Sequence, residues 1–63
     1  MCVGDIVFFP EEGGFIKYII KKIVQNEILV ISYKTRQFNW LNVSDVIGLD
    51  DFIKVYKNER IFE

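Results

Sequence analysis

Histidine is absent from this chain of 63 residues, and cysteine and proline occur once each, as Cys2 and Pro10. A single cysteine cannot form a disulfide within the chain, and without histidine or a second cysteine the common zinc sites cannot form. Nucleophilic catalysis by a Ser–His or Cys–His pair is excluded for the same reason. We therefore expect no bound metal, no cofactor and no enzymatic activity.

A strong excess of one charge is also lacking, because the net charge is −1 and the pI is near 5.3. Nucleic-acid-binding domains are usually basic overall, and this chain is not. The charges are unevenly distributed, however. The basic residues in the middle of the chain are Lys17, Lys21, Lys22, Lys34 and Arg36. Acidic residues in the predicted loops are Glu11, Glu12, Asp45, Asp50 and Asp51. One face of the protein can therefore still be basic.

Long apolar runs are missing too. The longest stretch without a charge runs from Gln37 to Ser44, far shorter than the roughly 20 residues of a membrane-spanning helix. We see no basic leader followed by an apolar run, and an unpaired cysteine is typical of a reducing compartment. We expect a soluble, cytoplasmic protein.

Hydrophobic residues make up 51% of the chain and aromatic residues 16%. This is a rich supply for a single small domain, which must be stabilised by its apolar core because no disulfide or metal supports it. We predict one domain over residues 1–63, with its core at about 4–56 and a charged tail at 57–63.

Short β-branched and aromatic runs alternate with turn residues, which predicts β-strands. The predicted strands span residues 6–9, 15–25, 28–33, 38–43 and 50–56. We expect Pro10 to end the first strand, since proline lacks the N–H of a ladder hydrogen bond. Gln25-Asn26-Glu27 is predicted to form a hairpin turn, and a bulge is expected near Ile20–Lys21 because apolar residues occupy both faces of that strand.

Two segments also fit a helix. In residues 15–25, Ile16, Ile19, Ile20 and Ile23 keep helical spacing, but β-branched content and the lack of a cap favour a strand. Residues 50–56 fit either a helix capped by Asp50 or a closing strand, and we favour the strand. Between the last two strands, Ser44 to Val46 is predicted to form one short helical turn with Ser44 as its N-cap.

The sequence Trp-Leu-Asn-Val-Ser-Asp-Val-Ile at 40–47 resembles the end of Tudor-type small barrels. Gly-Asp-Ile-Val at 4–7 resembles the first strand of KOW-type barrels, and together with Gly13-Gly14 it is similar to small bacterial YodC-like proteins of unknown function. The resemblance implies an all-β fold over residues 4–56. It would be a five-stranded SH3-like barrel with a one-turn 3-10 helix before the last strand.

Four aromatic residues are candidate contact residues: Tyr18, Tyr33, Phe38 and Trp40. The resemblance implies that aromatic side chains at one rim line a partner groove or cage a methylated cation through cation–π attraction. The alternative is that they fill the core. The resemblance also implies that the loop carrying Glu11 and Glu12 walls the groove, where it would select a basic peptide, and the alternative is a solvated hairpin loop.

The candidate basic face consists of Lys17, Lys21, Lys22, Lys34 and Arg36. Lysines that neutralise phosphates beside tyrosines that stack on bases are typical of proteins that bind single-stranded nucleic acid. The alternative is a solvated face whose lysines protect a sheet edge.

These patterns lead us to expect a non-catalytic binding module of bacterial, phage or mobile-element origin. A protein partner is the first expectation, bound around the first loop and the turn at Lys34–Gln37. The second is RNA or DNA bound by a KOW- or Tudor-like barrel. The third is a homo-oligomer formed by edge-strand pairing or through Ile61-Phe62.

Overall fold

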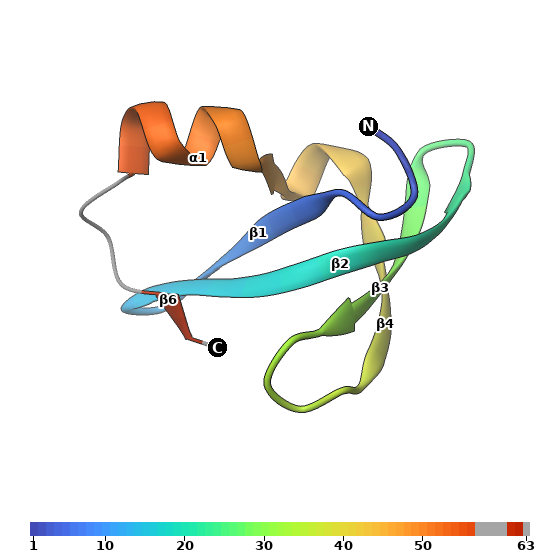
Figure 1. The fold of residues 1–63 in the computed structure, drawn as a ribbon, viewed down its shortest axis with the longest axis horizontal. Coiled ribbons are helices and arrows are strands. Elements are labelled where there is room, and N and C mark those ends of the chain that lie inside the picture. The colour runs from blue at the N-terminus through green and yellow to red at the C-terminus, as the bar shows by residue number, and fades with distance from the viewer. Residues whose placement is uncertain (57–60, 63) are drawn as a thin grey trace.

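The computed structural model describes residues 1–56 and 61–62. It is mostly β, with five antiparallel strands, one 3-10 turn and a short helix (Figure 1). The antiparallel strands are β1 (Ile6–Glu11), β2 (Gly14–Val24), β3 (Glu27–Ser32), β4 (Phe38–Asn42) and β5 (Ile47–Gly48). The 3-10 turn η1 (Val43–Asp45) lies between β4 and β5, and helix α1 (Leu49–Tyr56) follows β5. A short strand, β6 (Ile61–Phe62), lies parallel to the start of β2.

The strand order is β4-β3-β2-β1-β5, so the long strand β2 lies at the centre of the sheet. One edge of β2 pairs with β1, and the other pairs with β3 from Tyr18 onward and with β6 at Phe15 and Ile16. The first four predicted strands are found, and the fifth antiparallel strand is Ile47–Gly48 rather than residues 50–56. Within the described residues, however, no hydrogen-bonded pairing joins β4 to β5, so closure into a barrel is not shown.

The predicted bulge in β2 is confirmed, because the β2–β3 register shifts between Ile20 and Lys22. Next to it, the N–H of Gly4 donates to the carbonyl oxygen of Ile20 (2.8 Å), and the N–H of Ile20 donates to the carbonyl oxygen of Asp5 (3.0 Å). A bulge adds one residue and reorients the side chains that follow. The prediction of a strand rather than a helix for 15–25 is confirmed as well.

The predicted closing strand at 50–56 is wrong, because this segment forms the helix α1. The fold is therefore mostly β rather than all-β. Phe52 and Tyr56 are four residues apart and so share one side of a helix. Both rings contact Phe15, which lies on β2. A strand over these residues could also have placed both on one face, so local pattern did not distinguish the two structures. The predicted tail lies outside the described residues except for β6.

Two smaller predictions also need correction. Pro10 does not end the first strand, because β1 continues through it to Glu11. Only Val7 and Phe8 of β1 pair with β5. Pro10 lies beyond them, where the missing N–H costs little because that edge of β1 needs no ladder hydrogen bond. The turn η1 is capped by Asn42 rather than Ser44, because Asn42 Oδ1 accepts the Ser44 N–H at 3.0 Å. The Ser44 hydroxyl donates to the same oxygen at 2.9 Å.

The sheet is apolar on both faces, and each face has its own cluster. Val7, Tyr18, Ile20, Ile28 and Val30 form the first cluster. Phe8, Phe15 and Phe52 form the second, beneath α1. Phe8 follows Val7 on β1, and successive side chains of a strand point to opposite faces. The face that carries the second cluster also carries the candidate site described next.

Candidate functional site

Two aromatic side chains of the edge strand β4 are exposed on one face of the sheet. Phe38 is 58% exposed and Trp40 is 51% exposed, and their spacing of two residues puts them on the same face. Leu41 follows Trp40, so it lies on the opposite face of the strand, where it packs against the first core cluster. β4 therefore exposes its two aromatic side chains on one face and packs Leu41 on the other.

The strand register shows what lies beside these rings. Phe38 pairs with Ile31 of β3, which pairs with Ile19 of β2. Side chains of directly paired residues lie on the same face. Phe38 therefore ends a row of four apolar residues that crosses the sheet and reaches Ile6 on β1.

A second row runs beside the first. Trp40 pairs with Leu29 of β3, and Leu29 pairs with Lys22 of β2. Leu29 is half-buried, whereas Lys22 is exposed. This row therefore begins with a cation on β2 and ends with an indole ring on β4.

Tyr33 and Lys17 complete the face at the end of β3. The N–H of Tyr33 donates to the carbonyl oxygen of Lys17 at 3.3 Å, and Lys17 Nζ lies 4.1 Å from the centre of the Tyr33 ring. A cation over a ring is attracted by its π electrons. The contact holds an ammonium group beside an aromatic ring that is still 38% exposed.

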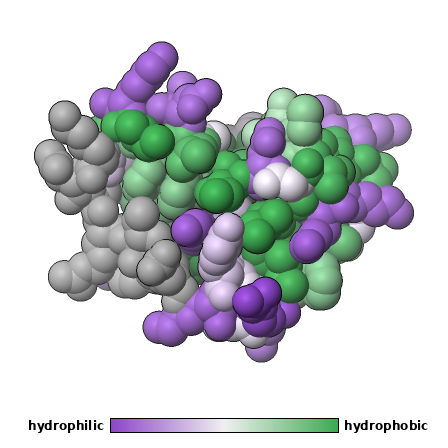
Figure 2. Space-filling model, viewed as in Figure 1, coloured by the Kyte–Doolittle hydropathy of each residue, from purple (hydrophilic) through white to green (hydrophobic). Residues whose placement is uncertain are grey.

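We call this surface the aromatic face. It comprises Ile19, Leu29, Ile31, Tyr33, Phe38 and Trp40, with Lys17 and Lys22 on its β2 side. Exposed and half-buried apolar residues so arranged form a continuous patch, a feature typical of interaction sites on small soluble domains. In Figure 2, hydrophobic residues lie together across the middle of the viewed side of the molecule and hydrophilic residues lie around them.

The turn after β3 positions the aromatic face. Ser32 is buried, and its carbonyl oxygen accepts the N–H of Arg36 at 3.0 Å while its own N–H donates to the carbonyl oxygen of Gln37 at 3.0 Å. The Ser32 hydroxyl accepts the N–H of Thr35 at 3.3 Å. These bonds close the predicted turn and fix Tyr33 and Phe38 at its two ends.

The structure brings together some of the predicted site residues and separates others. Tyr33, Phe38, Trp40, Lys17 and Lys22 meet on the aromatic face. Tyr18 is only 6% exposed and belongs to the first core cluster, the alternative that the sequence left open.

The remaining predicted residues lie elsewhere. Lys21 lies at the bulge, and Arg36 lies in the turn after β3. Lys34 lines a small cavity of about 230 Å³ on the opposite face, together with Tyr18 and Ser32. Glu11 and Glu12 lie in the β1–β2 hairpin, where Glu11 lines a cavity of about 340 Å³ with Phe15 and Tyr56. The turn at Lys34–Gln37 and the first loop therefore line two different cavities.

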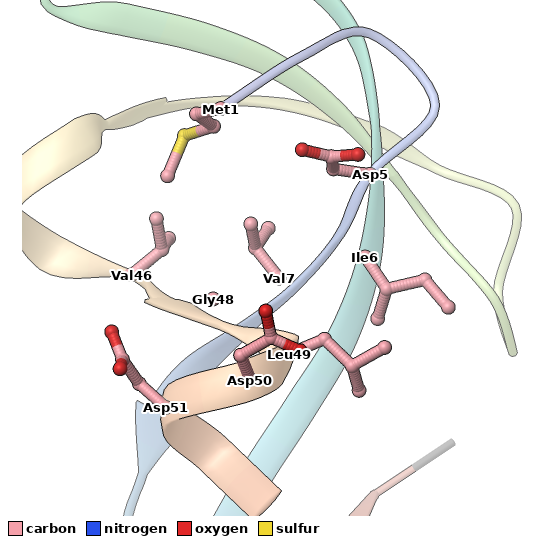
Figure 3. Close-up of a pocket in the computed structure, with 9 residues that line it drawn as sticks. All are labelled: Met1, Asp5, Ile6, Val7, Val46, Gly48, Leu49, Asp50 and Asp51. Carbon is pink, nitrogen blue, oxygen red and sulfur yellow. The ribbon is translucent and has the colours of Figure 1, made fainter.

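Sequence reasoning missed Ile19, Leu29 and Ile31, which form the floor of the aromatic face. The signal for these residues was the alternation of side chains along β2 and β3, but alternation alone does not tell which face of the sheet is covered by the rest of the protein. It also missed a cavity of about 520 Å³ beside β5 and the start of α1 (Figure 3). Three carboxyl groups, of Asp5, Asp50 and Asp51, lie around this cavity among apolar side chains.

The described residues carry no signature of a metal centre or of a membrane-spanning helix. Among residues 1–56 and 61–62, no group of three or more Cys, Asp or Glu side chains is arranged to hold a metal ion. None of the helices in this part of the chain is long and apolar enough to cross a membrane.

Comparison with known proteins gives no match. No family model, no curated protein and no solved structure matches this chain.

Proposed function

We propose that this protein is a non-catalytic nucleic-acid-binding module of SH3-like type, and that the aromatic face is its contact surface. The observation that carries the proposal is that Tyr33, Phe38 and Trp40 are exposed on the same sheet face as Lys17 and Lys22. Aromatic side chains interleaved with lysines supply the stacking surfaces and the cations that nucleic acids require.

The SH3-like part of the proposal is supported by topology. Five antiparallel strands with a 3-10 turn before the fifth agree with the arrangement that the sequence resemblance implies. The strongly bulged central strand fits a sheet that curves around the first core cluster.

The distribution of charge favours a nucleic acid over other partners. Residues 14–44 contain five basic residues and one acidic residue, Glu27. The acidic residues Asp5, Asp50 and Asp51 surround the cavity at β5 and α1. None of these three residues lies on β2, β3 or β4, the strands that carry the aromatic face.

A protein partner is the second candidate, because β4 is an edge strand among residues 1–56 and 61–62. Residues 38–42 contain neither proline nor a charged residue, and those are the usual means of preventing an edge from pairing. Such an edge can accept a strand from another protein or from a second copy of this chain. Binding of that kind would depend little on salt concentration.

The test is a titration of the protein with mixed-sequence RNA and DNA oligonucleotides, followed by fluorescence anisotropy. We expect saturable binding that weakens steeply between about 50 mM and about 200 mM salt, because bound lysines release counterions from the phosphates. Lys22→Glu should weaken binding and reduce the slope of log affinity against log salt by roughly 1.

Lys54→Glu is the matched control, since it makes the same charge change on an exposed residue of α1. It should leave the slope unchanged. Absence of binding at low salt, or equal loss in the two variants, would contradict the proposal and direct attention to the edge of β4.

A further inference from the structure

Resting on the proposed function, we infer that the ligand is single-stranded, with successive bases stacked on Trp40 and Phe38 and a third on Tyr33. Three features support this inference. They are the spacing of the Phe38 and Trp40 rings, the positions of Lys17 and Lys22 at the two ends of the aromatic face, and the position of the acidic residue Glu27.

The ring spacing selects against a duplex. Phe38 and Trp40 are two residues apart on one strand, so their Cα atoms are about 7 Å apart. Bases in one strand of a duplex are stacked roughly 3.4 Å apart, with their faces covered by neighbours. Only an unstacked strand can present one base to each ring, and exposed aromatic residues on sheets bind single strands in this way.

Two cations lie where the backbone of such a strand needs them. Lys17 Nζ lies over one face of the Tyr33 ring, 4.1 Å from its centre. A base that stacks on this face displaces the ammonium, whose flexible side chain can turn toward the phosphate of the same nucleotide. Lys22 begins the row that ends at Trp40. Its Cα lies about two strand spacings, roughly 10 Å, from that of Trp40, and its flexible side chain can turn toward a phosphate along the row.

The acidic residue Glu27 lies at one end of the face. It pairs with Val24 and Asn42, in the row beyond Trp40. A strand that crosses the rings of Trp40, Phe38 and Tyr33 therefore runs away from Glu27 and toward Lys17. The three rings accommodate about three nucleotides, slightly fewer than the roughly 4–16 nucleotides bound by one single-strand-binding OB fold.

Trp40 is the one tryptophan of the chain, so its fluorescence reports directly on the inferred site. The probes are single-stranded DNA and RNA of about ten nucleotides, the duplex of the same sequence, and an abasic strand of equal length. We expect both single strands to quench Trp40 and to bind at least about tenfold more tightly than the duplex or the abasic strand, neither of which offers free base faces. The RNA and DNA arms decide which is preferred.

Phe38→Ala should weaken single-strand binding by about 5-fold to 150-fold, the effect of removing one stacking ring. Val55→Ala is the matched control, because Val55 is an exposed apolar residue of α1, and it should have no effect. Phe38 is more than half exposed, so its replacement should preserve the fold, which the amide spectrum of each variant would verify.

The outcomes separate this inference from the proposed function. Equal, salt-dependent affinity for the single strand, the duplex and the abasic strand, without quenching of Trp40, would overturn base stacking while leaving a nucleic-acid-binding module. No binding of any of these probes at low salt would overturn both, and would favour a protein partner at β4.

Discussion

At the scale of single residues, Phe52 joins the helix to the sheet. Its ring stacks on Phe8, with centroids 3.8 Å apart and an interplanar angle of 17°, and it meets the edge of Phe15 at 5.0 Å. It is buried, whereas its neighbour Ile53 is 54% exposed. The side chains of Phe52 and Ile53 should therefore contribute very differently to the free energy of unfolding.

Phe52→Ala should lower the free energy of unfolding by about 3–5 kcal/mol, through lost burial and the cavity it leaves. A chain of this size has about 3–9 kcal/mol in total at typical values per residue, so the variant should be close to unfolding. Ile53→Ala is the matched control and should change stability by less than about 1 kcal/mol. Urea denaturation measures both, and similar midpoints would mean that α1 does not pack on Phe8.

At the scale of elements, the β2–β3 hairpin contains a strained residue at its turn. Gln25 has φ of 56°, in the left-handed region that side chains with a Cβ disfavour. Val24 pairs with Glu27, so Gln25 and Asn26 form a two-residue loop. This short loop sets the register that places Leu29 beside Lys22.

Gln25→Gly should raise the free energy of unfolding by about 1 kcal/mol, since glycine adopts positive φ without the steric cost. Asn26→Gly is the control, because φ of Asn26 is not positive, and it should lower stability or leave it unchanged. Thermal denaturation of the two variants tests this. A lower melting temperature for Gln25→Gly would show that the turn has another conformation.

At the scale of the whole molecule, the sheet has a protected centre and an open side. β2 pairs on both edges, whereas β4 pairs only with β3 among the described residues. The unpaired edge of β4 adjoins the aromatic face, so the least protected part of the sheet carries the proposed contact surface. The cytoplasmic location of the protein and its bacterial, phage or mobile-element origin stay predictions.

Hydrogen exchange should reflect this architecture. The amides of Ile20 and Val30, in the first core cluster, should exchange only on global unfolding, while alternate amides of β4 should exchange far faster because their N–H groups point to solvent. NMR-detected exchange of the free protein provides the measurement. Uniform protection of β4 would mean that its outer edge is covered, either by closure of the barrel or by a second molecule.

The four longer strands, the hairpin turn and the bulge of β2 were determined by the sequence itself. These features depend on near neighbours along the chain. β-branched runs favour strands, turn residues favour turns, and apolar residues at both odd and even positions of a strand favour a bulge. The basic set and the aromatic set could likewise be named from the sequence, together with the expectation of a binding module.

Only the tertiary structure decided which of those residues lie at the surface together. Tyr18 and Tyr33 look alike in sequence, but a register shift of one residue reverses the face of every side chain that follows, and the register buries Tyr18 and exposes Tyr33. The same holds for α1, whose residues fit a strand or a helix locally. The helix became the structure here because Phe52 packs against Phe8 and Phe15, which lie far from it in the sequence.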